Sequence, residues 1–299
     1  MVFATEPPKE CQEDGFWYNK FAMEKEISKK GPISVFDSGF GGLEILREIV
    51  KELPEYDYIY LGDTARAPYG SRSQEVVYKF TKQAVDFLFK HNSPLVILAC
   101  NTASSEALHR IQREYLPKHY PNRRVLGVVI PAAEAAVEVT QNNRIGVIAT
   151  ESTVASGAFE RELKKLNPEL EVFQNACPLL VPIIEAGEHN SGVADNLIKN
   201  YLKSLIKEHI DTLILGCTHY GLLEAKIRKI TDGKVNIISE GKIVAEKLKD
   251  YLMRHPEIES KLGKNSEIKF LTTDLTDKFK TLGSQFFGRQ IKPEKVNLE

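Results

Sequence analysis

The segments ILACNTAS (97–104) and LILGCTHYG (213–221) share one pattern, an apolar run that ends in a cysteine followed by polar residues. Apolar runs of this length, rich in Ile and Leu, are typical of strands buried on both faces. Each segment therefore predicts a strand with a thiol at its carboxyl end. The two cysteines, Cys100 and Cys217, are separated by about one domain's length, which favours two similar lobes.

Similar apolar runs recur along the chain and alternate with amphipathic segments of helix length. Strands are expected at 33–37, 58–63, 95–100, 125–130, 144–150, 212–217, 235–239 and 268–274, and helices at 43–53, 74–91 and 196–209, among others. Nearly continuous apolar strands alternating with helices predict an α/β fold with parallel-rich sheets. We expect a polar leader at 1–31 and two similar α/β lobes, the first formed by 32–127 plus 240–299 and the second by 128–239.

The composition of the 299-residue chain excludes several classes of protein. Hydrophobic residues make up 42% and charged residues 27%, as in ordinary globular proteins, and the net charge of −1 provides no overall attraction for nucleic acid or an anionic membrane. No apolar run approaches the roughly 20 residues that span a bilayer, and the leader lacks the apolar core of a signal peptide. We therefore expect a cytoplasmic protein without nucleic-acid or membrane partners.

The four cysteines, Cys11, Cys100, Cys177 and Cys217, are far apart and form no CxxC pair. A disulfide framework or a cysteine-rich zinc site is therefore not expected, and in a reducing compartment these are free thiols. A free cysteine is most often a small buried hydrophobic residue, and we interpret Cys11 and Cys177 in this way.

More polar residues lie at the expected carboxyl ends of strands, where open α/β sheets bind ligands. FDSGFGGL (36–43) places Asp37 and Ser38 before glycines that let the backbone approach a ligand. Glu185 follows another apolar run, and His219 lies two residues after Cys217. Neither GxGxxG nor a GKS or GKT segment is present, so nucleotide binding is not supported.

The pair of cysteines with polar neighbours suggests acid–base chemistry. A thiol has an ordinary pKa of about 8.5, which its surroundings can tune towards neutrality. Two thiols on opposite faces of one carbon could remove a proton from one side and return a proton on the other, which is a racemisation without a cofactor. A reaction with a single cysteine, such as acyl transfer, would leave the second strand-end cysteine unexplained.

Six motifs in this order resemble the glutamate racemase family of the aspartate/glutamate racemase superfamily. They are DSGFGGL (37–43), GDTARAPYG (62–70), ACNTAS (99–104), IGVIAT (145–150), ACPLLVPIIEAG (176–187) and LGCTHYGLL (215–223). The resemblance extends from about residue 32 to about residue 250. It implies two lobes with the active site between them, a homodimer, and a reaction that needs no cofactor or metal.

The resemblance also implies roles for individual residues. Cys100 would serve D-glutamate and Cys217 L-glutamate, with Asp37, Glu185 and His219 as further catalytic residues. The implied substrate contacts are Asp37, Ser38, Pro68, Tyr69, Gly70, Asn101, Thr102, Thr218 and His219. The reaction would interconvert the two enantiomers of this small-molecule amino acid and supply D-glutamate for peptidoglycan.

Three positions depart from the family's usual motifs. Ile130 stands where an acidic residue commonly precedes a proline, and Gly221 replaces the proline of CTHYP. ISEG (238–241) places Glu240 in a segment that commonly holds an Asp-Ser pair. None of these changes removes a catalytic group.

Two other functions remain open from the sequence. One is a racemase of the same superfamily that acts on another amino acid such as aspartate, although His219 after the second Cys-Thr pair favours glutamate. The other is a binding or inhibitory protein on a racemase-like scaffold, with idle cysteines. Thiol reactivity distinguishes the second, because cysteines of an active site should react with alkylating agents and be protected by glutamate.

Overall fold

The computed structural model of the chain describes residues 30–298, and the part from Gly31 onward forms one compact unit. The predicted leader, including Cys11, lies outside the described residues except for its last two positions. No helix among the described residues is long and apolar enough to cross a membrane.

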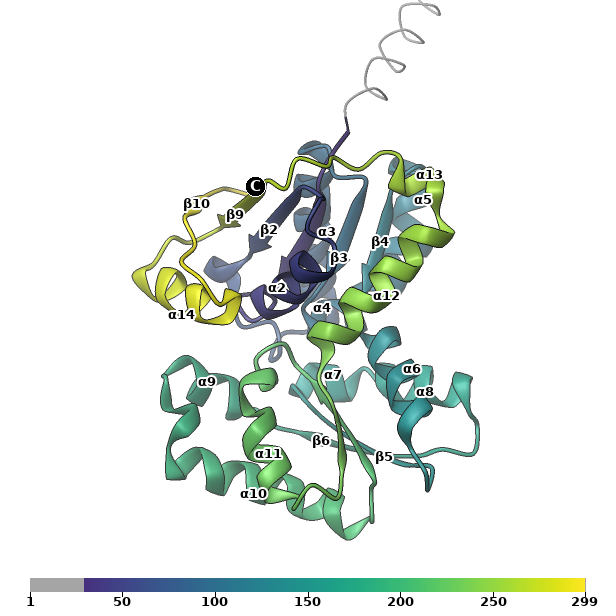
Figure 1. Cartoon of the computed structure of the whole chain (residues 1–299), viewed down its shortest axis with the longest axis vertical. Coiled ribbons are helices and arrows are strands. Elements are labelled where there is room, and N and C mark those ends of the chain that lie inside the picture. Colours follow the sequence, from purple (N-terminus) through teal and green to yellow (C-terminus); the bar gives the residue numbers. More distant parts are fainter. Residues whose placement is uncertain (1–29, 299) are drawn as a thin grey trace, which may run out of the picture. The chain divides into compact units, whose positions relative to one another are not determined.

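Two sheets organise residues 30–298 (Figure 1). The first has the strand order β10-β9-β2-β1-β3-β4 and the second β6-β5-β7-β8, and the neighbouring strands pair in parallel. The strands are β1 (Ile33–Asp37), β2 (Tyr58–Gly62), β3 (Leu95–Leu98), β4 (Arg124–Gly127), β5 (Arg144–Ala149), β6 (Glu171–Ala176), β7 (Thr212–Gly216), β8 (Asn236–Ile238), β9 (Ile268–Thr272) and β10 (Pro293–Lys295). The predicted α/β fold with parallel sheets is confirmed.

The two sheets repeat one arrangement of strands. The order β2-β1-β3-β4 in the first sheet corresponds to β6-β5-β7-β8 in the second. Cys100 follows the third strand of the first lobe, and Cys217 follows the third strand of the second lobe. The two thiols therefore occupy equivalent places in two similar lobes. This sheet membership supports our proposed division of the chain into 32–127 plus 240–299 and 128–239.

Helices connect the strands and cover the sheets. They are α2 (Leu43–Glu52), α3 (Gln74–Lys90), α4 (Asn101–Arg110), α5 (Leu116–His119), α6 (Val129–Val139), α7 (Glu151–Ala155), α8 (Ala158–Leu166), α9 (Leu180–Glu185), α10 (Gly192–Lys207), α11 (Glu224–Ile230), α12 (Glu240–Arg254), α13 (Pro256–Glu259) and α14 (Asp277–Phe287). Helix α12 leaves the second lobe and packs beside α2 of the first (Figure 1). The chain therefore crosses between the lobes at the start of α12.

Three details of the sheets differ from the sequence prediction, and one is that the short strand β10 was not expected. The strand expected at 125–130 ends at Gly127, because Val129 begins α6 and Pro131 lies in its first turn, where a missing N–H leaves no helical bond unmade. Strand β6 was not expected, because EVFQNA lacks a continuous apolar run. It is an edge strand of the second sheet, and its residues are exposed or half-buried, so it does not need an apolar sequence.

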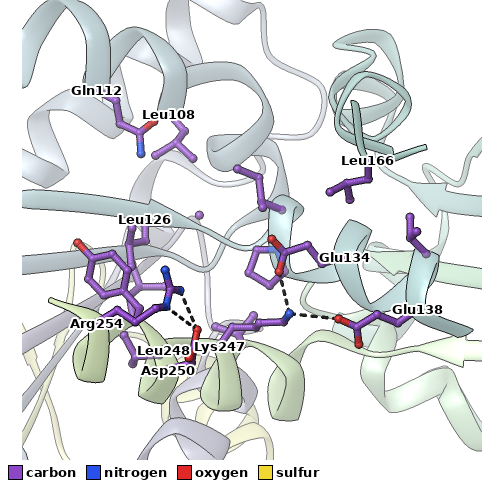
Figure 2. Close-up of a pocket in the computed structure, with 17 residues that line it drawn as sticks. Leu108, Gln112, Leu126, Glu134, Glu138, Leu166, Lys247, Leu248, Asp250 and Arg254 are labelled. Carbon is purple, nitrogen blue, oxygen red and sulfur yellow. Dashed lines mark hydrogen bonds and ion pairs between the residues drawn. The ribbon is translucent and has the colours of Figure 1, made fainter. Parts of the chain in front are cut away.

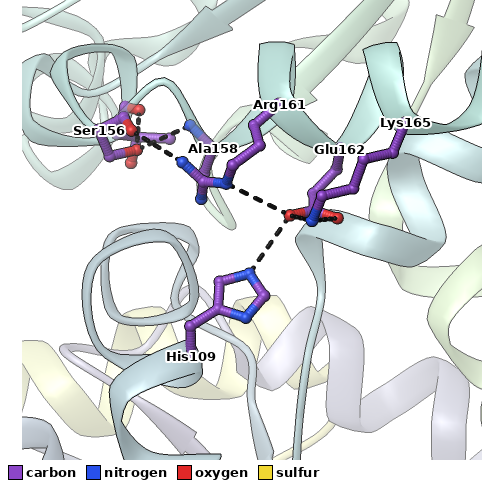
Figure 3. A network of polar contacts seen from close by, with 7 residues as sticks. His109, Ser156, Ala158, Arg161, Glu162 and Lys165 are labelled. Carbon is purple, nitrogen blue, oxygen red and sulfur yellow. Dashed lines mark hydrogen bonds and ion pairs between the residues drawn. The ribbon is translucent and has the colours of Figure 1, made fainter. Parts of the chain in front are cut away.

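A polar network joins α4 of the first lobe to α8 of the second (Figure 3). The carboxylate of Glu162 lies 3.2 Å from Nε2 of His109, 2.9 Å from Nζ of Lys165 and 3.5 Å from Nε of Arg161. Burial alone would raise the pKa of Glu162, but the hydrogen bonds and charges of Lys165 and His109 lower it. The network therefore stabilises the contact between lobes while Glu162 is ionised.

Glu162→Gln is expected to lower the free energy of unfolding by about 1 kcal/mol at neutral pH, as one lost charge-assisted hydrogen bond would. Because the folded-state pKa of Glu162 lies below its ordinary value of 4.5, this stability is present above that value and is lost as the pH falls. Thermal unfolding between about pH 3 and pH 8 measures the difference. Glu160→Gln, an exposed position on the same helix, is the control, and an equal effect at both positions would contradict this account.

Candidate active site

A cavity of about 750 Å³ lies where the carboxyl ends of strands from both sheets meet. It confirms the expectation of a site between the lobes. The predicted site residues that line it are Ser38, Pro68, Tyr69, Gly70, Cys100, Asn101, Thr102, Glu185, Cys217, Thr218 and His219. Asp37 is not among the lining residues; it is 1% exposed and contacts Thr218, which lines the cavity.

Cys100 lies just before α4 and is 6% exposed. Its thiol donates to the hydroxyl of Ser38 at 3.4 Å. Burial, and then the charge of Asp37, raise the pKa of this thiol to about 11, against a smaller lowering by Ser38. The thiol is therefore protonated at neutral pH.

Cys217 faces the same cavity from the second lobe and is 8% exposed. Its sulfur lies 3.9 Å from Nδ1 of His219. Burial raises the pKa of this thiol well above its ordinary value, the backbone N–H of His219 lowers it, and negative charge on Cys100 or Asp37 raises it. Because ionisation of one cysteine opposes ionisation of the other, the state with one thiolate and one thiol is favoured over the state with two thiolates.

Asp37, at the end of β1, is 1% exposed and holds the loop that follows it. Its Oδ2 accepts from the backbone N–H of Gly39 at 2.8 Å, and its Oδ1 accepts from the hydroxyl of Thr218 at 3.3 Å. Burial raises the pKa of this carboxyl, and His219 lowers it. At Gly41 an added Cβ would lie only 2.4 Å from Oγ1 of Thr218, so only glycine allows this loop to approach so closely.

Glu185, at the end of α9, faces His219. Its Oε1 lies 3.3 Å from Nε2 of His219, and its Oε2 accepts from Nζ of Lys278 at 2.9 Å. Burial alone would raise the pKa of Glu185, but His219 and Lys278 together lower it. The side chains of Glu185, His219 and Cys217 therefore form a chain of neighbouring acid–base groups.

Two residues that line this cavity, Thr150 and Lys278, were not predicted from the sequence. Thr150 ends the quoted motif IGVIAT, and its hydroxyl lies 3.0 Å from that of Thr102 across the lobes. Its place at a strand end was a signal that could have identified it. Lys278 belongs to no quoted motif and reaches Glu185 only through the fold.

Tyr69 has a different environment from that of the other predicted contacts. It is 1% exposed, and its hydroxyl donates to Oδ2 of Asp63. Asp63 also accepts from Arg66 at 2.7 Å. The hydroxyl of Tyr69 therefore donates its hydrogen bond within the protein. The backbone of the Pro68–Gly70 turn is the part of this segment that remains to contact a ligand.

Cys177 is completely buried and lines the cavity with the polar residues. Its thiol lies 3.6 Å from the backbone oxygen of Asn175, and burial raises its pKa to about 12. No charged group shifts that pKa. These surroundings agree with the interpretation of Cys177 as a structural residue.

None of the three departures from the family motifs is among the residues that line this cavity. Gly221 packs against Glu44, and an added Cβ would lie 2.2 Å from Oε2 of that residue. Ile130 is 40% exposed and lines a second cavity of about 590 Å³, which shares no lining residue with the first. There Lys247 lies between Glu134, at 2.8 Å, and Glu138, at 3.4 Å (Figure 2).

Within residues 30–298, no group of three His, Cys, Asp or Glu side chains is placed to hold a metal ion. Cys100, Cys177 and Cys217 are free thiols. That the reaction needs no metal or cofactor stays a prediction, which an assay with purified protein tests.

Comparison with known proteins gives concordant similarities. Residues 38–248 match the family model described as Asp/Glu/Hydantoin racemase. The glutamate racemase of Sulfurihydrogenibium sp. is 41% identical over 268 residues, 89% of this chain and 97% of that protein. A solved glutamate racemase isoform from Bacillus anthracis has a TM-score of 0.82 at 37% identity, covering 90% of this chain and 98% of that chain. The Francisella tularensis glutamate racemase, solved in complex with D-glutamate, has a TM-score of 0.82 at 34% identity with the same coverage.

Proposed function

The chain belongs to the Asp/Glu/Hydantoin racemase family, among its glutamate racemases, and we propose that Cys100 and Cys217 carry its reaction. It interconverts L- and D-glutamate and supplies the D-isomer for peptidoglycan synthesis, the known role of glutamate racemases. The observation that supports the role of the cysteines is that Cys100 and Cys217, which follow equivalent strands of the two lobes, line one cavity.

The proposed reaction moves one proton at each thiol. With L-glutamate, the thiolate of Cys217 takes the proton from Cα, and the electron pair of the C–H bond stays on the substrate as a carbanion. The thiol of Cys100 then gives its proton to the opposite face of the carbon, forms a thiolate and yields D-glutamate. The reverse reaction exchanges the roles, so each cysteine is a base in one direction and an acid in the other.

The surrounding polar groups have supporting roles in this proposal. Asp37 sets the protonation of the two thiols through its charge, and His219 with Glu185 forms an acid–base chain beside Cys217. The substrate's carboxylates are held by hydroxyl, amide and backbone donors. The hydroxyls belong to Ser38, Thr102 and Thr218, the amide to Asn101, and the backbone donors to Tyr69 and Gly70 in the turn that begins at Pro68.

Glutamate is expected to be turned over at least about tenfold more efficiently than aspartate, which corresponds to about 1.4 kcal/mol of lost transition-state binding. Aspartate is one methylene shorter, so it leaves buried donors unmet, and each such group costs about 1–3 kcal/mol. Glutamine should also be poor, because its amide presents donors where acceptors are needed. Steady-state kinetics on the three amino acids measures this, and equal efficiency on aspartate would favour a broader racemase.

The activity itself is tested with purified protein and no added cofactor, starting from either L- or D-glutamate and following circular dichroism. Because the enantiomers have equal free energy, both reactions should end at the same 1:1 mixture. Alkylation of Cys100 and Cys217, slowed by glutamate, should stop the reaction. If the protein binds glutamate but leaves its optical activity unchanged, the non-catalytic alternative is correct.

We also propose a cytoplasmic homodimer that binds neither nucleic acid nor membranes. Free thiols at Cys100, Cys177 and Cys217 fit a reducing compartment. Exposed apolar side chains such as Val193, 62% exposed, and Leu179, 52% exposed, offer surface for contact between subunits. Sedimentation velocity over a range of protein concentrations measures the oligomeric state.

A further inference from the structure

Glu240 is a buried carboxyl that the proposed chemistry does not use. It is 5% exposed and begins α12, where the chain passes from β8 of the second sheet into the first lobe. Its Oε2 accepts from Nδ2 of Asn101 at 2.8 Å. Asn101 is 2% exposed, lines the cavity and directly follows Cys100. The contact therefore joins the lobe crossing to the residue beside a proposed catalytic thiol.

One polar atom on each side of this contact lacks a hydrogen-bond partner among the described residues. These atoms are Oε1 of Glu240 and Oδ1 of Asn101. An ionised carboxylate only accepts hydrogen bonds, so it cannot serve the amide oxygen. A protonated carboxyl has an O–H donor as well as an acceptor, and it matches an amide, which offers one of each. Protonation of Glu240 would supply the kind of donor that the amide oxygen lacks.

The surroundings of Glu240 also disfavour its anion. The carboxyls of Glu44 on α2 and Asp37 on β1 face it, and Glu48 of α2 packs against the next residue, Gly241. The amide of Asn101 and the N-terminus of α12 favour negative charge, but burial has the largest effect and holds the pKa of Glu240 well above 4.5. A charge here would also raise the pKa of Cys217 further.

We propose that Glu240 is a positioning residue of this racemase: as a neutral carboxylic acid it accepts from and donates to the Asn101 amide, and so fixes that amide beside Cys100. The inference rests on the proposed function of the cavity. The second N–H of the amide remains for the substrate.

Racemisation by Glu240→Gln and Glu240→Ala tests the positioning role. The glutamine side chain keeps one donor and one acceptor for Asn101, so the kcat of Glu240→Gln should stay within about threefold of the parent value. Glu240→Ala should lower kcat at least about tenfold. The alkaline limb of the Glu240→Gln profile should extend to higher pH, because no carboxyl can ionise there. Glu246→Gln, an exposed carboxyl on the same helix, is the matched control. A fully active Glu240→Ala, or a Glu240→Gln as impaired as alanine, would overturn the proposal.

A second measurement does not depend on catalysis. Because burial raises the folded-state pKa of Glu240, its contribution to stability is fully present below its unfolded pKa of about 4.5 and declines as the pH rises above that value. Glu240→Gln should therefore melt at a higher temperature than the parent protein at neutral pH, and the gap should close as the pH falls towards about 4. Glu246→Gln should show no such gap.

Infrared difference spectra distinguish failure of the proposal for Glu240 from failure of the proposed racemase function. The parent protein at pH 8 should show the C=O stretch of a protonated carboxyl that is missing in Glu240→Gln. If the parent protein lacks this C=O band, and if the difference in melting temperature between Glu240→Gln and the parent does not change with pH, Glu240 is not a neutral carboxyl. This conclusion would hold even if the protein is an active racemase. If the parent protein does not racemise glutamate, the proposed function fails, while the band and the melting gap still report on Glu240.

Discussion

Replacing either Cys100 or Cys217 by serine is expected to lower kcat/KM by about 10²–10⁴-fold, the usual contribution of a positioned acid–base group. A serine hydroxyl is far less acidic than a thiol, so it cannot form the required base in this pocket. Because the two enantiomers have equal free energy, kcat/KM for L- and D-glutamate must fall by the same factor in each variant. Circular dichroism with each enantiomer measures both values.

Cys177→Ser is the matched control for this experiment. The thiol of Cys177 is also buried and already contacts the backbone oxygen of Asn175 at 3.6 Å, so a serine hydroxyl has an acceptor there. This variant is expected to keep turnover within about threefold of the parent protein. If Cys100→Ser or Cys217→Ser is folded and keeps near-parental turnover, the two-base mechanism is wrong.

Asp37→Asn is expected to lower kcat by at least about tenfold, which corresponds to about 1.4 kcal/mol of lost transition-state stabilisation. The charge of Asp37 raises the pKa of both thiols, so its loss makes each thiolate a weaker base towards Cα–H. The same change should move the ascending limb of the kcat/KM profile to lower pH. Kinetics between about pH 6 and pH 10 measures both effects.

Asp37 also has a structural contact that must be separated from this role. It accepts the N–H of Gly39 at 2.8 Å, and asparagine keeps an acceptor oxygen for that bond. The melting temperature of Asp37→Asn should therefore change little. A purely structural role predicts the opposite pattern, a loss of about 1 kcal/mol in stability with an unshifted pH profile.

The strands that bring the thiols together could be predicted because they are buried on both faces. Strands β3 and β7 read as continuous apolar runs, so Cys100 and Cys217 could be placed at their ends before the fold was known. Strand β6 could not, because an edge strand that is exposed or half-buried has no need of an apolar sequence. The topology shared by the two sheets depends on β6, which pairs with β5 as β2 pairs with β1.

Contacts within the site were harder to predict, because they join residues far apart in the chain. Lys278 reaches Glu185 from α14, and Glu240 reaches Asn101 from the start of α12. Neither lysine nor glutamate carries a local pattern that indicates a buried partner. Thr150 differs, because its position at the end of an apolar strand was visible in the sequence.

The central claim, that two thiols act on opposite faces of Cα, is tested most directly by racemising L-glutamate in heavy water and analysing the first few per cent of reaction by NMR. Cys217 would remove the protium, and Cys100 would deliver deuterium from solvent to the other face. The account predicts that the D-glutamate formed carries deuterium at Cα while the remaining L-glutamate keeps protium. Deuterium entering the recovered L-glutamate as fast as the product, or protium retained in the product, would show that one base serves both faces and would contradict the account.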